Sequence, residues 1–169
     1  MAYEAKAIAN YFLACGKHDG ISISPMKIQK LVYYAHGWYL GFTDNPLIKE
    51  QVEAWRYGPV IPSLYDAFRQ YGRGAITSPA TNIVFPEGNV NVLHAKFQEV
   101  EPPTEPQLVS YLDSIWSLYK NYSATQLSNM THAAGTPWAE TWHEEIPDNT
   151  DIDPIKIKQH FKDKLQAAK

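Results

Sequence analysis

The longest apolar pattern in the chain lies between residues 24 and 42. Ser24 offers a side-chain oxygen as an N-cap, and Pro25 suits the first helical position, where its missing N–H costs nothing. The apolar residues that follow at helical spacing are Ile28, Leu31, Val32, Ala35, Trp38, Tyr39 and Phe42. Because Tyr33, Tyr34 and Leu40 occupy other faces, the helix is apolar nearly all round, as a helix in a core or against a partner should be. We predict that it is the central helix of the fold.

Shorter apolar stripes predict helices on either side of the central one. The first covers about residues 5–14 and ends in the segment 16–20. The dipeptide Gly58-Pro59 then breaks the chain, and a second stripe covers residues 61–71. Gly72 follows it and suits a left-handed C-cap.

The second half of the chain carries three more helix signals. Thr104 and Gln107 have the spacing of a capping box before one apolar stripe, and Ser123 and Gln126 repeat that spacing before another. An amphipathic helix of about residues 154–168 has lysines toward its end, where positive charge complements the helix dipole.

Two segments predict extended structure. Residues 47–55 alternate imperfectly between apolar and polar, which is typical of a short edge strand. The turn residues Glu87-Gly88-Asn89 between residues 83–85 and 90–93 predict a small hairpin. We therefore predict a mainly α (α+β) fold: a compact single-domain helical bundle around the central helix at about 24–42, with a small β-hairpin or short strands.

The length and composition favour one domain that covers residues 1–169. A chain of 169 residues is in the usual size range of a single domain. Its 44% apolar and 13% aromatic residues provide enough surface to offset the loss of chain entropy on folding. We expect a core at about residues 5–145, joined by the C-terminal amphipathic helix at about 154–168.

Charge and cysteine content narrow the expected surroundings and partners. A formal charge of −3 and a pI near 6.0 give no cationic field, so nucleic acid is not an expected partner. The one cysteine, Cys15, lies in an apolar helical segment and fits a reducing compartment. The sequence lacks a signal-peptide pattern and any apolar run of about eighteen residues. We expect a cytoplasmic protein with no membrane partner.

The sequence contains no recognised catalytic motif. Its six histidines lie far apart, and no two have the i, i+4 spacing of a helical zinc site. The Gly-x-Ser-x-Gly elbow and the two glycine-rich phosphate-binding patterns do not occur. We expect no enzyme activity, no cofactor and no metal. The alternative is a hydrolase that uses His36 or His132 with an acid such as Asp66.

Aromatic residues are the clearest excess in the composition. The chain has five tryptophans and eleven tyrosines, and Tyr, Trp and Arg are the residues that most often dominate protein interfaces. The segment Trp55-Arg56-Tyr57-Gly58-Pro59 places three such side chains beside a rigid turn, which would present them at low entropic cost. Two interpretations are equally supported: contact with a partner, or attachment of this corner to the central helix.

Three blocks of the sequence resemble one known family. The first is KIQKLVYYAHGWYL at residues 27–40, the second is EAWRYGPV at 53–60 followed by 65–72, and the third is 127–138, which contains Thr131-His132 and ends in Thr-Pro-Trp. The blocks run in family order within about residues 5–145. The chain thus resembles the Panacea-domain antitoxins, which include SocA-like proteolytic adaptors and phage-associated proteins.

The resemblance implies the antitoxin of a bacterial toxin–antitoxin system, as found in prophages. The implied partner is a cognate toxin, encoded by an adjacent gene and neutralised by direct protein–protein binding. The alternative function is a proteolytic adaptor that delivers the toxin to a ClpXP-type protease. Because the sequence shows no added DNA-binding or degradation module, sequestration is favoured. Carried onto this chain, the family motif suggests toxin contacts at Trp38, Trp55, Arg56, Tyr57, His132 and Trp138.

Overall fold

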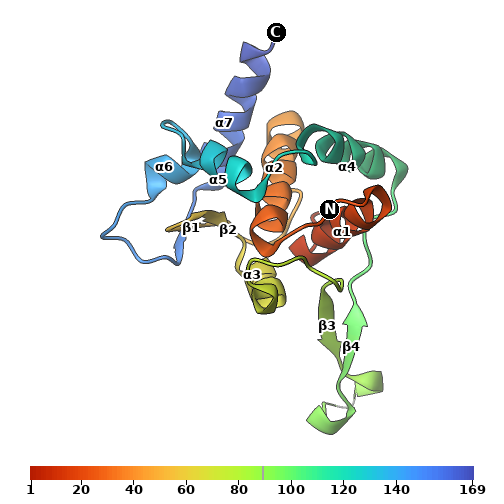
Figure 1. Cartoon of the computed structure of the whole chain (residues 1–169). Coiled ribbons are helices and arrows are strands. Elements are labelled where there is room, and N and C mark those ends of the chain that lie inside the picture. The colour runs from red at the N-terminus through yellow and green to blue at the C-terminus, as the bar shows by residue number, and fades with distance from the viewer. Residues whose placement is uncertain (89) are drawn as a thin grey trace.

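The computed structural model describes residues 1–88 and 90–169 as a body of helices with two small sheets (Figure 1). The α-helices of this part of the chain are α1 (Ala5–Asp19), α2 (Pro25–Thr43), α3 (Pro62–Phe68), α4 (Pro106–Tyr119), α5 (Ala124–His132), α6 (Pro137–Thr141) and α7 (Pro154–Ala167). The strands are β1 (Glu53–Trp55), β2 (Gly58–Val60), β3 (Thr81–Val84), β4 (Lys96–Glu99) and β5 (Thr150–Asp151). The prediction of a mainly α fold with minor β structure is confirmed.

Helix α2 is the centre of the body, as its apolar surface predicts. The Ser24 side chain caps it by accepting a hydrogen bond from the Lys27 backbone N–H at 3.3 Å. Every residue from Lys27 to Gly37 is buried. The helix packs against α1, α3, α4, α5 and α7, and in Figure 1 it lies between the α1–α4 pair and the C-terminal elements.

Helix α7 crosses α2 at two glycines that allow a close approach. A Cβ added to Gly37 would lie 2.0 Å from Cε2 of Phe161, and one added to Gly41 would lie 3.0 Å from its Cβ. Phe161 is fully buried against this face. The predicted amphipathic helix therefore belongs to the core through its first two turns, and its C-terminal end extends beyond the body (Figure 1).

The capping signals of the second half are partly confirmed. Ser123 and Gln126 form both hydrogen bonds of a capping box at the start of α5. The box predicted at Thr104 and Gln107 is wrong, because α4 begins at Pro106 and Glu105 is its N-cap residue. Proline has no backbone N–H, so the first helical position leaves no donor that a side chain would have to cap.

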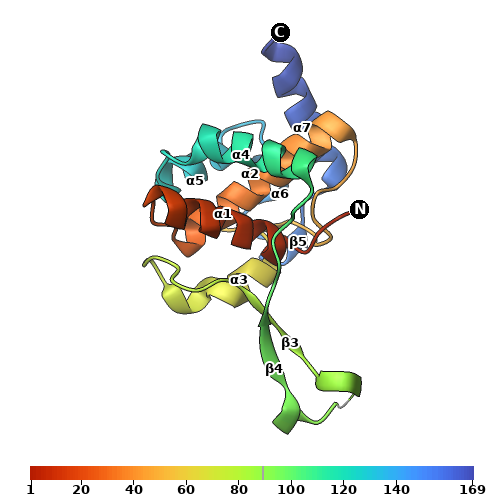
Figure 2. The ribbon, with the colours of Figure 1, turned by 90° about the vertical axis from the view of Figure 1, so that its right-hand side faces the viewer.

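The strands form two separate antiparallel sheets. One has the order β2-β1-β5, and the other is the β3–β4 hairpin, which projects from the helical body (Figure 2). The predicted hairpin is confirmed, but its second strand is 96–99 and not 90–93, since Val92–His94 forms a 3₁₀ turn. Of the predicted turn residues, Asn89 lies outside the described residues. Within the described chain no helix is long and apolar enough to cross a membrane.

Candidate partner-binding site

The β1–β2 turn presents two of the predicted contact residues at its tip. Trp55 pairs with Gly58, so Arg56 and Tyr57 form a two-residue loop. Gly58 has φ = +116°, a conformation that residues with a Cβ rarely adopt. Tyr57 is 68% exposed, and the Arg56 guanidinium lies 5.8 Å from the centre of its ring. The chain geometry thus directs a cation and an aromatic ring toward solvent.

Lys30 of α2 supports this turn from inside the protein. Its Nζ donates hydrogen bonds to the carbonyl oxygens of Pro59 at 3.0 Å and Tyr57 at 3.3 Å, although the residue is only 2% exposed. Within the described chain no carboxylate forms a salt bridge with it, and burial lowers its pKa to about 7. Backbone carbonyls therefore take the place of a counter-ion, and they fix the turn on the central helix.

Helices α5 and α6 hold the turn from the other side. Ser128 Oγ donates to the Tyr57 carbonyl oxygen at 3.3 Å, and Trp138 Nε1 donates to the Trp55 carbonyl oxygen at 2.6 Å. The rings of Trp138 and His132 meet edge to face, with centroids 4.2 Å apart. Five of the six predicted residues, Trp55, Arg56, Tyr57, His132 and Trp138, thus converge on one turn.

His132 is the polar side chain beneath this arrangement. Its Nε2 is buried and has no hydrogen-bond partner among the described residues. Burial, with a further contribution from the Lys30 charge, lowers its pKa, so the ring is neutral near pH 7. A neutral ring packed on Trp138 serves the aromatic packing of the site.

The sequence comparisons assign the chain to a family. The sequence model described as "Antitoxin SocA-like, Panacea domain" matches residues 28–139. Antitoxin SocA of Caulobacter vibrioides is 32% identical over 135 residues, which cover 80% of this chain and 68% of SocA. The chain belongs to the SocA-like Panacea domain family. No solved structure matches it.

The Panacea domain match contains the turn and the residues that hold it from α2, α5 and α6. Residues 28–139 run from the first turn of α2 into α6, and so include Lys30, the β1–β2 hairpin and Trp138. Lys30 was not among the residues singled out from the sequence. Its signal is a charged side chain in a helix that is apolar nearly all round, and Lys27 shares that signal.

Trp38 lies apart from the other five residues in the Panacea domain. Its Nε1 donates to the Tyr119 hydroxyl at 2.7 Å, and its ring meets Phe161 edge to face at 5.0 Å. Trp38 is therefore part of the packing between α2, α4 and α7.

Two further residues extend the exposed face of the turn. The ring of Tyr65 on α3 lies 4.8 Å from that of Trp55 and is partly exposed. On the other side, a recess of about 520 Å³ is lined by Arg56, Trp142 and residues of the 144–148 loop. Asp148 ties this loop to the turn by accepting a hydrogen bond from the Arg56 backbone N–H at 3.2 Å. Neither Tyr65 nor Trp142 was predicted as a contact.

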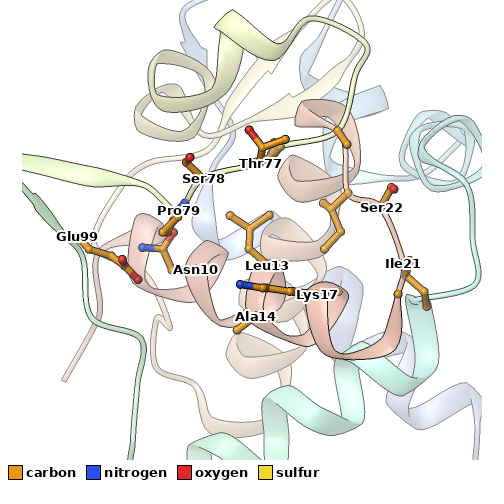
Figure 3. Close-up of a pocket in the computed structure, with 15 residues that line it drawn as sticks. Asn10, Leu13, Ala14, Lys17, Ile21, Ser22, Thr77, Ser78, Pro79 and Glu99 are labelled. Carbon is orange, nitrogen blue, oxygen red and sulfur yellow. The ribbon is translucent and has the colours of Figure 1, made fainter.

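A second concavity lies between α1 and residues 75–79, and much of its lining precedes the matched residues 28–139 (Figure 3). This groove of about 750 Å³ has a mixed lining, in which Leu13 and Ile21 accompany polar residues such as Ser22 and Thr77. The described residues that line it include no histidine or cysteine, and Glu99 is their one carboxylate. Lys17 is the one residue with a basic side chain in this described lining.

The residues of the hydrolase alternative are placed separately. His36 is buried, and its Nδ1 accepts a hydrogen bond from the Ile48 backbone N–H at 3.5 Å, whereas Asp66 is exposed on α3. His132 packs on Trp138. In residues 1–88 and 90–169, no group of three His, Cys, Asp or Glu side chains is arranged to hold a metal ion.

Proposed function

We propose that this chain neutralises a cognate protein toxin, encoded by an adjacent gene, by binding it through the exposed face of the β1–β2 turn. Membership of the SocA-like family supports the antitoxin role. The observation that carries the choice of surface is an exposed Arg56–Tyr57 tip on a backbone fixed by Lys30 and Trp138. Arg and Tyr are frequent binding hot spots, and a preorganised loop loses little entropy on binding.

The other predicted residues take supporting parts in this proposal. Trp55 packs on Tyr65, and these two rings enlarge the contact face around Tyr57. Trp138 and His132 position the turn from within, and Trp38 supports the fold through α7. Contact with the toxin is therefore assigned to Arg56, Tyr57 and the exposed edges of the two packed rings.

The proposal is tested by co-expressing the chain with the product of the adjacent open reading frame. Wild-type chain should restore growth, and the double variant Arg56→Ala/Tyr57→Ala should bind that product about 100-fold more weakly in calorimetry, as expected for two hot-spot side chains. The matched control is Tyr122→Ala, which removes another partly exposed tyrosine, and its affinity should stay within about twofold of wild type.

The outcomes separate the function from the surface. If wild-type chain does not restore growth, the antitoxin proposal is wrong. If the double variant folds and binds as tightly as wild type, the turn is not the contact surface.

A second measurement separates sequestration from delivery to a protease. Sequestration predicts that the toxin's lifetime in cells is unchanged or longer when the chain is present. A lifetime that shortens only in cells with an active ClpXP-type protease would replace sequestration by adaptor function.

A further inference from the structure

The β3–β4 hairpin is an arm with a firmly attached base. Asn10 of α1 is buried, and its side chain donates to the carbonyl oxygens of Ala80 at 3.0 Å and Val100 at 2.8 Å while it accepts from the Ala80 N–H at 2.7 Å. Lys6 donates to the Thr81 carbonyl oxygen at 3.0 Å. Both strands are thus fixed to α1 at the point where they leave the body (Figure 2).

The outer half of the arm is apolar and exposed. Its large apolar residues are between 41% (Phe85) and 88% (Leu93) exposed, and they comprise Ile83, Phe85, Val90, Val92, Leu93 and Phe97. Six side chains of this kind present roughly 600–900 Å² of exposed surface in total on one short arm. An isolated two-stranded hairpin is also only marginally stable in water, so a partner that covers it would stabilise it.

The distribution of these residues determines the shape of the partner. Ile83 and Phe97 lie opposite each other in the register and share one face of the ribbon, whereas Phe85 follows β3 and Leu93 belongs to the 3₁₀ turn at the tip. Two arms packed face to face through Ile83 and Phe97 would bury roughly 300 Å² per copy. That area is far below the about 800 Å² that each partner contributes to a stable interface. Packing of two arms through this pair would therefore be too small for a stable dimer and would leave the tip uncovered.

The charge of the arm determines the chemistry of the partner. From residue 83 to residue 95, Glu87 is the one residue with a formal charge at pH 7. Charged side chains return only at the base, with Lys96 and Glu99 of β4. A convex, nearly uncharged apolar tip is complementary to a concave apolar cleft.

We infer that the β3–β4 arm inserts its tip into an apolar cleft of the toxin, as a second contact separate from the β1–β2 turn. The inference rests on the proposed function, because it takes the toxin as the partner. The tip enters the cleft, the hydrogen bonds of Asn10 hold the arm at a fixed direction, and the groove beside Glu99 lies where the partner surface would meet α1 (Figure 3).

The test uses the full chain and the product of the adjacent open reading frame. The double variant Leu93→Ser/Phe97→Ser should lower the affinity for that product at least about 100-fold, since it replaces two exposed anchors of the tip. The matched control is Leu118→Ser/Ile155→Ser, which replaces two other exposed apolar residues on α4 and α7 and should change affinity less than about twofold. All four replaced side chains are large and exposed in the free chain, so circular dichroism should show both variants folded.

Photo-crosslinking identifies what covers the tip. A benzoylphenylalanine in place of Leu93 should crosslink to the toxin at residues that line an apolar cleft. Crosslinking to a second copy of this chain, or a dimer of the purified chain that the arm variant abolishes, would overturn the inference, and so would the absence of any crosslinked product.

The results also distinguish this inference from the proposed function. If wild-type chain restores growth and the arm variant does so equally well, the inference is wrong and the function stands. If wild-type chain does not restore growth but position 93 still crosslinks to a cleft of the neighbouring product, the arm is a docking element and the neutralisation proposal is wrong. If wild-type chain does not restore growth and position 93 gives no crosslink to the neighbouring product, the inference and the neutralisation proposal are both wrong.

Discussion

The ammonium group of Lys30 occupies the space where a side chain at position 58 would begin. An ideal Cβ on Gly58 would lie 2.6 Å from Lys30 Nζ and 3.1 Å from Thr131 Oγ1. The central helix and α5 therefore meet the β1–β2 turn at the one residue that has no side chain. The close approach allows Lys30 to reach the carbonyl oxygens of Tyr57 and Pro59.

Gly58→Ala should destabilise the fold more than a glycine substitution at a helix end. Gly58 combines a positive φ with the contact to Lys30, whereas Gly20 has φ = +68° with no atom within 4 Å of its ideal Cβ. Gly20→Ala should cost about 1 kcal/mol of strain, and Gly58→Ala about 2–4 kcal/mol, because strain and collision add. Urea unfolding of the two variants measures the difference. Equal losses would show that the Lys30 side chain moves away from the added methyl group without lowering the free energy of unfolding.

Lys30 should make the protein more stable as the pH rises from 7 toward 10. Its folded pKa is about 7 and its ordinary value is 10.5, so in this window the unfolded chain binds the extra proton. The free energy of unfolding then increases with pH, by at most about 1.4 kcal/mol per pH unit for one group. Urea midpoints measured between pH 7 and 9.5 should rise more steeply for wild type than for Lys30→Met. Lys27, whose pKa burial also lowers, is present in both proteins. Parallel slopes would contradict the assignment.

His36 should make stability depend on pH in the same direction as Lys30, but in the acidic range. Burial lowers its pKa from 6.5 to about 4, so between these values the unfolded chain binds a proton that the folded chain does not. Stability should therefore fall as the pH is lowered from about 6.5 to 4. His36→Gln keeps an acceptor for the Ile48 N–H and removes the titration, so its urea midpoint should fall less over the same range. A loss as large as that of wild type would assign the acid sensitivity to other groups.

Gly37→Ala should loosen the attachment of α7. The added methyl group would overlap the Phe161 ring, and such overpacking costs about 1–3 kcal/mol. Phe161→Leu removes part of the ring, so the double variant Gly37→Ala/Phe161→Leu should be more stable than the sum of the two single losses predicts. A double-mutant cycle by urea unfolding measures this coupling. Strict additivity would show that the methyl group and the ring do not compete for space.

The helices were accessible from the sequence because their signals are local. The Ser24 cap, Pro25 and the apolar stripe of the central helix lie within one segment, and the structure places α2 at Pro25–Thr43. The prediction of a Thr104–Gln107 capping box was wrong because Pro106, which lies between these two residues, begins the helix instead. The predicted position of the hairpin's second strand was wrong because the apolar residues among 90–93 matched a strand pattern, although they lie exposed on the arm.

By itself the sequence determined the central helix, the kind of fold and the aromatic segment at Trp55 to Tyr57, since each depends on residues close together in the chain. Only the tertiary structure decided which residues share a site. Trp138 and Lys30 reach the turn from more than 25 positions away on either side, and Trp38 is drawn to α7. Which partner a buried polar side chain finds depends on how the helices pack, because its hydrogen bonds must be satisfied wherever the fold places it. That packing is a property of the whole chain and leaves no signal in any single segment.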